Sequence, residues 1–81
     1  MTTAIDSRIR EVMAEVLDVA PETIEDGFRR DEATTWDSMN HLRLISALEE
    51  AFAIRFTMRE VSEMESFADV RRRVAERVPA A

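Results

Sequence analysis

Glycine and proline, the residues most typical of tight turns, are almost absent from this chain, which has one glycine and two prolines among its 81 residues. A β-protein of this length needs several short hairpins, and hairpin turns depend on glycine and a few other turn-forming residues. Helices need far fewer of them, so this scarcity favours an all-α fold. The length leaves room for one hydrophobic core, and we expect a single domain over residues 1–81.

The spacing of apolar residues predicts a first helix from Ile5 to Leu17. Steps of three and four place these residues on one helix face. The apolar residues of this helix are Ile5, Ile9, Val12, Met13, Val16 and Leu17. Thr3 and Asp6 have the spacing of a capping pair at its start.

A long loop is predicted over residues 19–36, where the periodicity stops. Pro21 prevents a helix from continuing, and Gly27 permits a turn. Loops of this length in a small domain usually have a function. We expect one short turn between Pro21 and Ile24, and we expect Ile24 and Phe28 to anchor the loop to the core.

A second helix is predicted from Ser38 to Phe52. Asp37 and Ser38 are both favoured at the N-cap position of a helix. The apolar stripe expected to face the core comprises Met39, Leu42, Ile45, Leu48 and Phe52, widened by Leu44.

Two more helices are marked by a serine or threonine with an acidic residue three positions later, the pattern of a capping box. Thr57 with Glu60 opens a short third helix that ends near Met64. Ser66 with Asp69 opens a fourth helix. That helix continues through Val70, Val74 and Val78 and ends at Pro79. The expected fold is a small four-helix bundle with three longer helices, a short third helix and a long first loop.

Cysteine and histidine are scarce in this chain, and its carboxylates lack the alternating spacing of a calcium loop. It has no cysteine, and His41 is its one histidine, so neither a thiolate site nor a histidine-rich metal site can form. His41 follows Ser38 by three residues, but a serine hydrolase also needs an orienting third group and oxyanion donors. We expect no catalytic residue and no metal site. We expect His41 to be a partly exposed polar residue of the second helix.

The charge is negative and concentrated in the first half of the chain. The net charge is −6, and residues 1–50 hold 12 acidic residues against five arginines. Such a surface repels nucleic acids and favours partners with basic patches. Arg71, Arg72 and Arg73 fan around a helix between acidic neighbours and are expected to form a solvated face. No apolar run exceeds four residues, so we expect no membrane insertion and a cytoplasmic location.

The Asp37–Ser38 pair has two interpretations that the residues alone do not separate. Both are ordinary at helix starts, where each can be a cap without further function. In the second interpretation the Ser38 hydroxyl is exposed at a helix N-terminus, just after a flexible loop. A modifying enzyme can reach it there, and a phosphate ester on it meets the positive end of the helix dipole.

The segment from Trp36 to Phe52 resembles the signature of acyl carrier proteins. Asp37 and Ser38, followed by the hydrophobic Met39, open the helix, and Leu48-Glu49-Glu50-Ala51-Phe52 closes it. The likeness extends over nearly the whole chain, including the helix order and the long loop. It implies that a separate phosphopantetheinyl transferase attaches 4'-phosphopantetheine from coenzyme A to Ser38. It also implies that the protein carries acyl groups as thioesters and catalyses no reaction itself.

The same resemblance assigns residues to partners and cargo. The expected partner contacts, which face basic patches of acyl-loading and acyl-processing enzymes, are Asp37, Met39, Arg43, Glu49 and Glu50. Arg43 stands where an acidic residue is usual, so we expect partners that differ from the general fatty-acid machinery. Glu49 and Glu50 are adjacent on the helix and are expected on the solvated surface. The expected acyl pocket is lined by Leu48, Phe56, Val61 and Met64, and the bulk of Phe56 predicts short cargo.

No linker flanks the predicted helices, so we expect a discrete, monomeric carrier that meets free-standing enzymes of a specialised lipid or polyketide-type pathway. An aminoacyl or peptidyl carrier is one alternative, although the serine of peptidyl carriers usually follows a glycine-rich approach. A helical protein-interaction module without any modification is the other.

Overall fold

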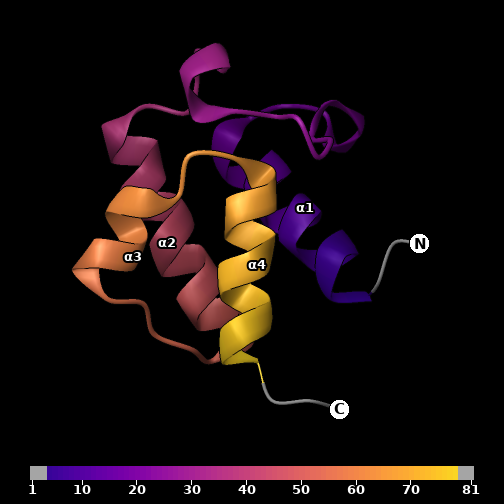
Figure 1. Ribbon diagram of the computed structural model, residues 1–81. Helices are drawn as coiled ribbons and strands as arrows, with labels where there is room; N and C mark the ends of the chain where they lie inside the picture. Colours follow the sequence, from indigo (N-terminus) through magenta and orange to yellow (C-terminus); the bar gives the residue numbers. More distant parts are fainter. Residues whose placement is uncertain (1–3, 79–81) are drawn as a thin grey trace.

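Four α-helices account for most of residues 4–78, which are the residues that the computed structural model describes (Figure 1). They are α1 (Ala4–Leu17), α2 (Ser38–Phe52), α3 (Met58–Glu63) and α4 (Phe67–Arg77). The predicted four-helix fold with a short third helix is therefore confirmed. The predicted cap at Thr3 and stop at Pro79 lie outside the described residues. Over residues 4–78, none of the helices has the length and hydropathy needed to cross a membrane.

The core is assembled from three helices and from residues between them. α1 packs against both α2 and α4. The buried apolar side chains are Ile9, Met13, Ala14, Leu17, Ile24, Trp36, Leu44, Ile45, Leu48, Ile54, Met64, Phe67, Val70 and Val74. Each large apolar side chain that is fully buried stabilises the fold by about 1.5–3 kcal/mol relative to exposure. α3 supplies none of these residues, so other contacts must hold it in place.

The long loop between α1 and α2 is anchored to the core. Its predicted short turn is present as the 3₁₀ helix η1 (Pro21–Thr23), and a second one, η2 (Arg30–Glu32), was not predicted. Ile24 is fully buried, and Phe28 packs on the core with its ring stacked on Trp36 at a centroid distance of 5.7 Å. Both predicted anchors are confirmed.

Two backbone hydrogen bonds join the middle of this loop to the segment before α4. The N–H of Arg30 donates to the carbonyl of Glu65 at 2.8 Å, and the N–H of Phe67 donates to the carbonyl of Phe28 at 3.0 Å. They accompany an isolated antiparallel bridge. Since these bonds use only main-chain atoms, a substitution of the Arg30 side chain leaves both of them possible.

The buried face of α2 differs from the predicted stripe. Met39 is 63% exposed and Leu42 is 59% exposed. The buried residues of α2 are His41, Leu44, Ile45 and Leu48. A step of three residues falls about 60° short of a full turn, so three such steps from Met39 to Leu48 move half-way round the helix. The prediction that Met39 and Leu42 face the core is wrong, and so is the prediction of a partly exposed His41.

The two predicted capping boxes have different outcomes. At α3 the box is complete: Thr57 Oγ1 accepts from the N–H of Glu60 at 3.1 Å, and Glu60 Oε1 accepts from the N–H of Thr57 at 2.9 Å. At α4 only half is present. Ser66 Oγ accepts from the N–H of Asp69 at 3.1 Å, but the Asp69 carboxylate accepts from the N–H of Glu65 instead of returning to Ser66.

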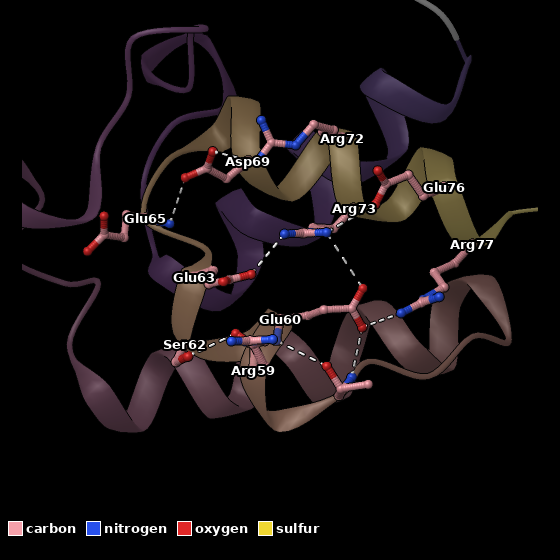
Figure 2. A network of polar contacts seen from close by, with 11 residues as sticks. Arg59, Glu60, Ser62, Glu63, Glu65, Asp69, Arg72, Arg73, Glu76 and Arg77 are labelled. Carbon is pink, nitrogen blue, oxygen red and sulfur yellow. Dashed lines mark hydrogen bonds and ion pairs between the residues drawn. The ribbon is translucent and has the colours of Figure 1, made fainter.

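Ion pairs join α3 to α4 (Figure 2). The Glu60 carboxylate accepts a hydrogen bond from Arg77 and lies 3.8 Å from Arg73 Nη1. Arg73 also lies 2.9 Å from Glu63. A helix of six residues is not stable alone, so these charged contacts and the capping box fix α3 in place.

The three consecutive arginines of α4 form more ion pairs than predicted. Arg71 pairs with Asp26 of the long loop at 2.7 Å, and Arg72 pairs with Asp69 at 3.3 Å. Arg71 and Arg73 are both partly covered. The prediction of a solvated face is therefore wrong for these two residues, because their guanidinium groups tie α4 to the loop and to α3.

Candidate functional site

α2 begins at the Asp37–Ser38 pair, and the two residues have different roles there. Asp37 has an extended backbone, and its Oδ1 accepts from the N–H of Asn40 at 2.8 Å, which makes it the N-cap. Ser38 is the first residue of the helix, and its side chain is exposed. Because Asp37 provides the side-chain cap, capping does not account for the Ser38 hydroxyl.

Two positively charged features lie beside Ser38, next to the carboxylate of the capping residue Asp37. The N-terminus of a 15-residue helix carries a partial positive charge from its free N–H groups. The Nη2 atom of Arg30, from η2, lies 3.5 Å from Ser38 Oγ. A phosphate ester on this oxygen meets both the helix N-terminus and a guanidinium group. The residues present therefore fit a phosphorylated group at Ser38.

Side-chain hydrogen bonds fix the start of α2 against its neighbours. Trp36 Nε1 donates to His41 Nδ1 at 3.0 Å, and His41 Nε2 lies 2.7 Å from the carbonyl oxygen of Val61. The indole nitrogen is only a donor, so Nδ1 carries no proton and Nε2 is the donor to Val61. Asn40 Nδ2 donates to the carbonyl of Thr35 at 2.7 Å. These bonds connect the end of the long loop, α2 and α3.

His41 is neutral in this position and does not act on Ser38. Burial of the ring holds the pKa of His41 below its ordinary value of 6.5; the hydrogen bond to Val61 opposes this shift, and the positive charge of Arg30 adds to it. Both ring nitrogens are already engaged, so neither is free to accept the Ser38 proton. In the described part of the chain, no group of three or more histidine, cysteine or carboxylate side chains is arranged to hold a metal ion.

The outward face of α2 combines apolar and charged side chains. Met39, Leu42, Arg43 and Glu50 are all exposed. A shallow groove on this face is lined by Met39, Leu42, Arg43, Ser46, Ala47 and Glu50. Three of the predicted partner residues, Met39, Arg43 and Glu50, therefore share one surface that begins next to Ser38.

Glu49 does not share that surface. Its side chain is only 17% exposed, and its Oε1 lies 3.6 Å from Arg55 Nη1. Its Oε2 accepts from the N–H of Phe56 at 2.9 Å. The prediction that Glu49 is a solvated surface residue is wrong, because its carboxylate organises the connection between α2 and α3.

The four residues predicted to line an acyl pocket belong to one hydrophobic cluster. Leu48 and Met64 are fully buried, whereas Phe56 and Val61 are half-buried and pack against the core. Leu48 comes from α2, Val61 from α3, and the other two from the segments that flank α3. Their role in binding an acyl chain stays a prediction.

Two features beside Ser38 were missed from the sequence. The approach of Arg30 depends on the path of a long loop, and no sequence pattern indicates that path. The burial of His41 did leave a signal, because His41 precedes Leu44 and Ile45 by three and four residues and so shares their helix face. Trp36 supplies the donor that a buried histidine needs.

Comparison with known proteins agrees with this geometry. A family model described as a phosphopantetheine attachment site matches residues 7–74, from α1 into α4. No curated protein matches the chain. Domains of the matched family are modified by phosphopantetheinyl transferases and catalyse no reaction themselves. The chain therefore belongs to the phosphopantetheine-attachment family and is a carrier domain whose prosthetic group is 4'-phosphopantetheine.

Proposed function

We propose that this chain is an acyl carrier protein and that Ser38 is its attachment residue. The observation that carries the proposal is the exposed Ser38 hydroxyl at the start of α2, beside Arg30, with the capping position filled by Asp37. When bound, the phosphopantetheine arm supplies a thiol that forms thioesters with acyl groups. The protein itself holds the phosphate end of the arm and presents the arm to other enzymes.

Attachment requires no base from this chain. The Ser38 Oγ–phosphorus bond forms as the diphosphate of coenzyme A breaks, and adenosine 3',5'-bisphosphate leaves. A magnesium-dependent transferase supplies the metal ion and the base that takes the hydroxyl proton. This division of labour is supported by His41, whose two ring nitrogens are occupied by Trp36 and Val61.

Partners are proposed to dock on the outward face of α2. Exposed Met39 and Leu42 offer apolar contact next to the arm, and Asp37 and Glu50 offer negative charge to basic patches. Arg43 adds a positive charge to the same face and favours partners that place a carboxylate opposite it. This pattern supports enzymes of a specialised lipid or polyketide-type pathway over the general fatty-acid machinery.

The cargo is proposed to be short. Leu48 and Met64 are fully buried, so an acyl chain entering between α2 and α3 must displace packed core side chains. The molecule is only 18 Å deep along its shortest principal axis, which limits the interior that a long chain can use. We expect a short acyl chain on the arm to raise Tm more than a long one, measured by thermal unfolding of matched acyl forms. Equal protection by both would contradict a small pocket.

An aminoacyl or peptidyl cargo is the main alternative within the same family. It uses the same attachment at Ser38 and differs only in the group that is loaded on the thiol. Loading assays with acyl transferases and with amino-acid-activating enzymes, run on the modified protein, separate the two.

The attachment itself is tested by intact mass. The protein is incubated with coenzyme A, magnesium and a broad-specificity phosphopantetheinyl transferase. The wild type is expected to gain the mass of one phosphopantetheine, and Ser38→Ala to gain none. Ser7→Ala, which removes another exposed helical serine, is the matched control and is expected to be modified like the wild type. Modification of Ser38→Ala, or no gain on folded wild type with several transferases, would refute the assignment.

A further inference from the structure

The guanidinium group of Arg30 occupies the space next to the attachment oxygen. Its Nη2 lies 3.5 Å from Ser38 Oγ, which is too long for a strong hydrogen bond to a neutral hydroxyl. Within residues 4–78 no carboxylate forms an ion pair with Arg30, whereas the neighbouring Arg29 pairs with Asp31 at 3.3 Å. A charged group is thus held close to Ser38 without a charged partner.

The backbone of Arg30 is held by a hydrogen bond that does not involve Ser38. Arg30 begins η2, and its main-chain N–H donates to the carbonyl of Glu65 at 2.8 Å. The Arg30 side chain is partly covered, so it has fewer conformations to lose on binding a ligand than a fully exposed arginine has. Substitution of the side chain leaves the main-chain hydrogen bond in place.

We propose that Arg30 binds the phosphate of the phosphopantetheine arm and, with the N-terminus of α2, forms a two-sided anion site around Ser38. The proposal rests on attachment at Ser38 as proposed above. A guanidinium group presents several N–H donors that match phosphate oxygens, and a charged acceptor shortens and strengthens such hydrogen bonds. The first bonds of the arm are thereby held on the η2 side of the helix start, while the outward face of α2 stays open to partners.

The first test measures how much the attached arm stabilises each protein. Unmodified and fully modified forms of the wild type, Arg30→Gln and Arg29→Gln are compared by thermal unfolding, after intact mass has confirmed modification. At about 10 mM ionic strength the gain in Tm on modification is expected to be about 3 °C smaller for Arg30→Gln than for the wild type. Arg29→Gln, which makes the same change in charge one residue away, is expected to keep the wild-type gain. At about 1 M salt the difference is expected to vanish.

The second test observes the phosphate directly. The ³¹P resonance of the attached phosphodiester is expected to shift in Arg30→Gln and to stay unchanged in Arg29→Gln. Equal gains in Tm for all three proteins, together with the same ³¹P resonance, would overturn the role of Arg30 while leaving attachment at Ser38 intact. Absence of any mass gain would instead refute the attachment and, with it, the anion site.

Discussion

Asp37 combines a hydrogen-bond acceptor with a negative charge, and substitution can separate the two properties. Asp37→Ala removes the acceptor for the Asn40 N–H and is expected to cost about 1 kcal/mol. For a domain of this size the loss corresponds to a decrease in Tm of roughly 4–8 °C. Asp37→Asn keeps the cap, because asparagine is as favourable as aspartate at this position. Its Tm, measured by circular dichroism at neutral pH, is expected to remain close to that of the wild type.

The same two variants also separate the effect of Asp37 on helix capping from its effect on recognition by partner enzymes. If Asp37 also meets basic patches of partners, Asp37→Asn slows modification by the transferase although the fold is unchanged. A decrease in Tm for Asp37→Asn as large as that for Asp37→Ala would show that charge, and not the N-cap hydrogen bond, stabilises the start of α2.

His41 makes stability depend on pH in a predictable direction. Its pKa in the folded protein lies below the ordinary 6.5, chiefly because burial disfavours the charged ring. The unfolded chain therefore binds a proton more readily, so the contribution of neutral His41 is complete above pH 6.5 and is lost as the pH falls below it. We expect the Tm of the wild type to decrease more steeply below pH 6.5 than the Tm of His41→Gln.

Because the chain has one histidine, the pKa of His41 can be measured by NMR without assigning other resonances. His41 is the one histidine of the chain, so its ring protons in an NMR titration report its pKa directly. Arg30→Gln removes a positive charge that lowers this pKa and is expected to raise it, whereas Arg8→Gln on α1 serves as a control. A His41 pKa at or above 6.5 in the wild type would contradict the buried, hydrogen-bonded ring.

At the scale of the elements, the Glu60 side chain makes several of the contacts that hold α3 in place. Glu60 completes the capping box with Thr57 and pairs with Arg73 and Arg77 of α4 (Figure 2). These contacts lower the pKa of Glu60 from 4.5 to about 2, with the hydrogen bond from Arg77 as the largest cause and that from the Thr57 N–H next. The folded protein therefore binds this proton less readily than the unfolded chain does. The stabilisation is complete above pH 4.5 and is lost as the pH falls toward 2.

Glu60→Gln is expected to lower Tm at pH 7, and the difference from the wild type is expected to shrink as the pH falls from 4.5 toward 2. Glu63→Gln removes the same charge from α3 but leaves the capping box and Arg77 in place, so its Tm should decrease less. Thermal unfolding over this pH range provides the measurement. A constant difference between Glu60→Gln and the wild type would show that ionisation of Glu60 does not stabilise α3.

The elements also show what the sequence can and cannot predict. The four helices and the capping box of Thr57 and Glu60 were predicted from local sequence patterns, and the structure contains both. The buried face of α2 was mispredicted because an apolar residue was assumed to face the core, although Met39 and Leu42 lie outward. Only the resemblance singled out Ser38 as the expected attachment residue, because the residues alone left a simple cap as an equal interpretation. The position of Arg30 beside it results from the tertiary path of the loop, and no local pattern encodes that path.

At the scale of the whole molecule, the charge distribution decides which partners can approach. The chain has a net charge of −6, and its first 50 residues hold all of the acidic excess. Many of these acids are already occupied: Asp26 pairs with Arg71, and Glu49 accepts from the Phe56 N–H. Exposed Arg43 lies in the groove on α2, with Glu50 among the other residues that line it. The outward face of α2, proposed above as the docking face, is therefore mixed in sign, unlike a uniformly acidic helix.

A mixed face predicts a measurable change in partner choice when its positive charge is reversed. Arg43→Glu makes every charge in this groove negative and is expected to raise kcat/KM roughly tenfold with an acyltransferase of fatty-acid synthesis whose docking patch is basic. Arg8→Glu changes the net charge equally but lies on α1, so the same assay should give wild-type rates. Before the comparison, circular dichroism checks that each variant is folded, and intact mass checks that it is fully loaded with the arm. If Arg43→Glu and Arg8→Glu change kcat/KM equally, the net charge of the protein, and not the position of Arg43, governs its association with the acyltransferase. If Arg43→Glu changes nothing, the outward face of α2 does not select partners through this residue.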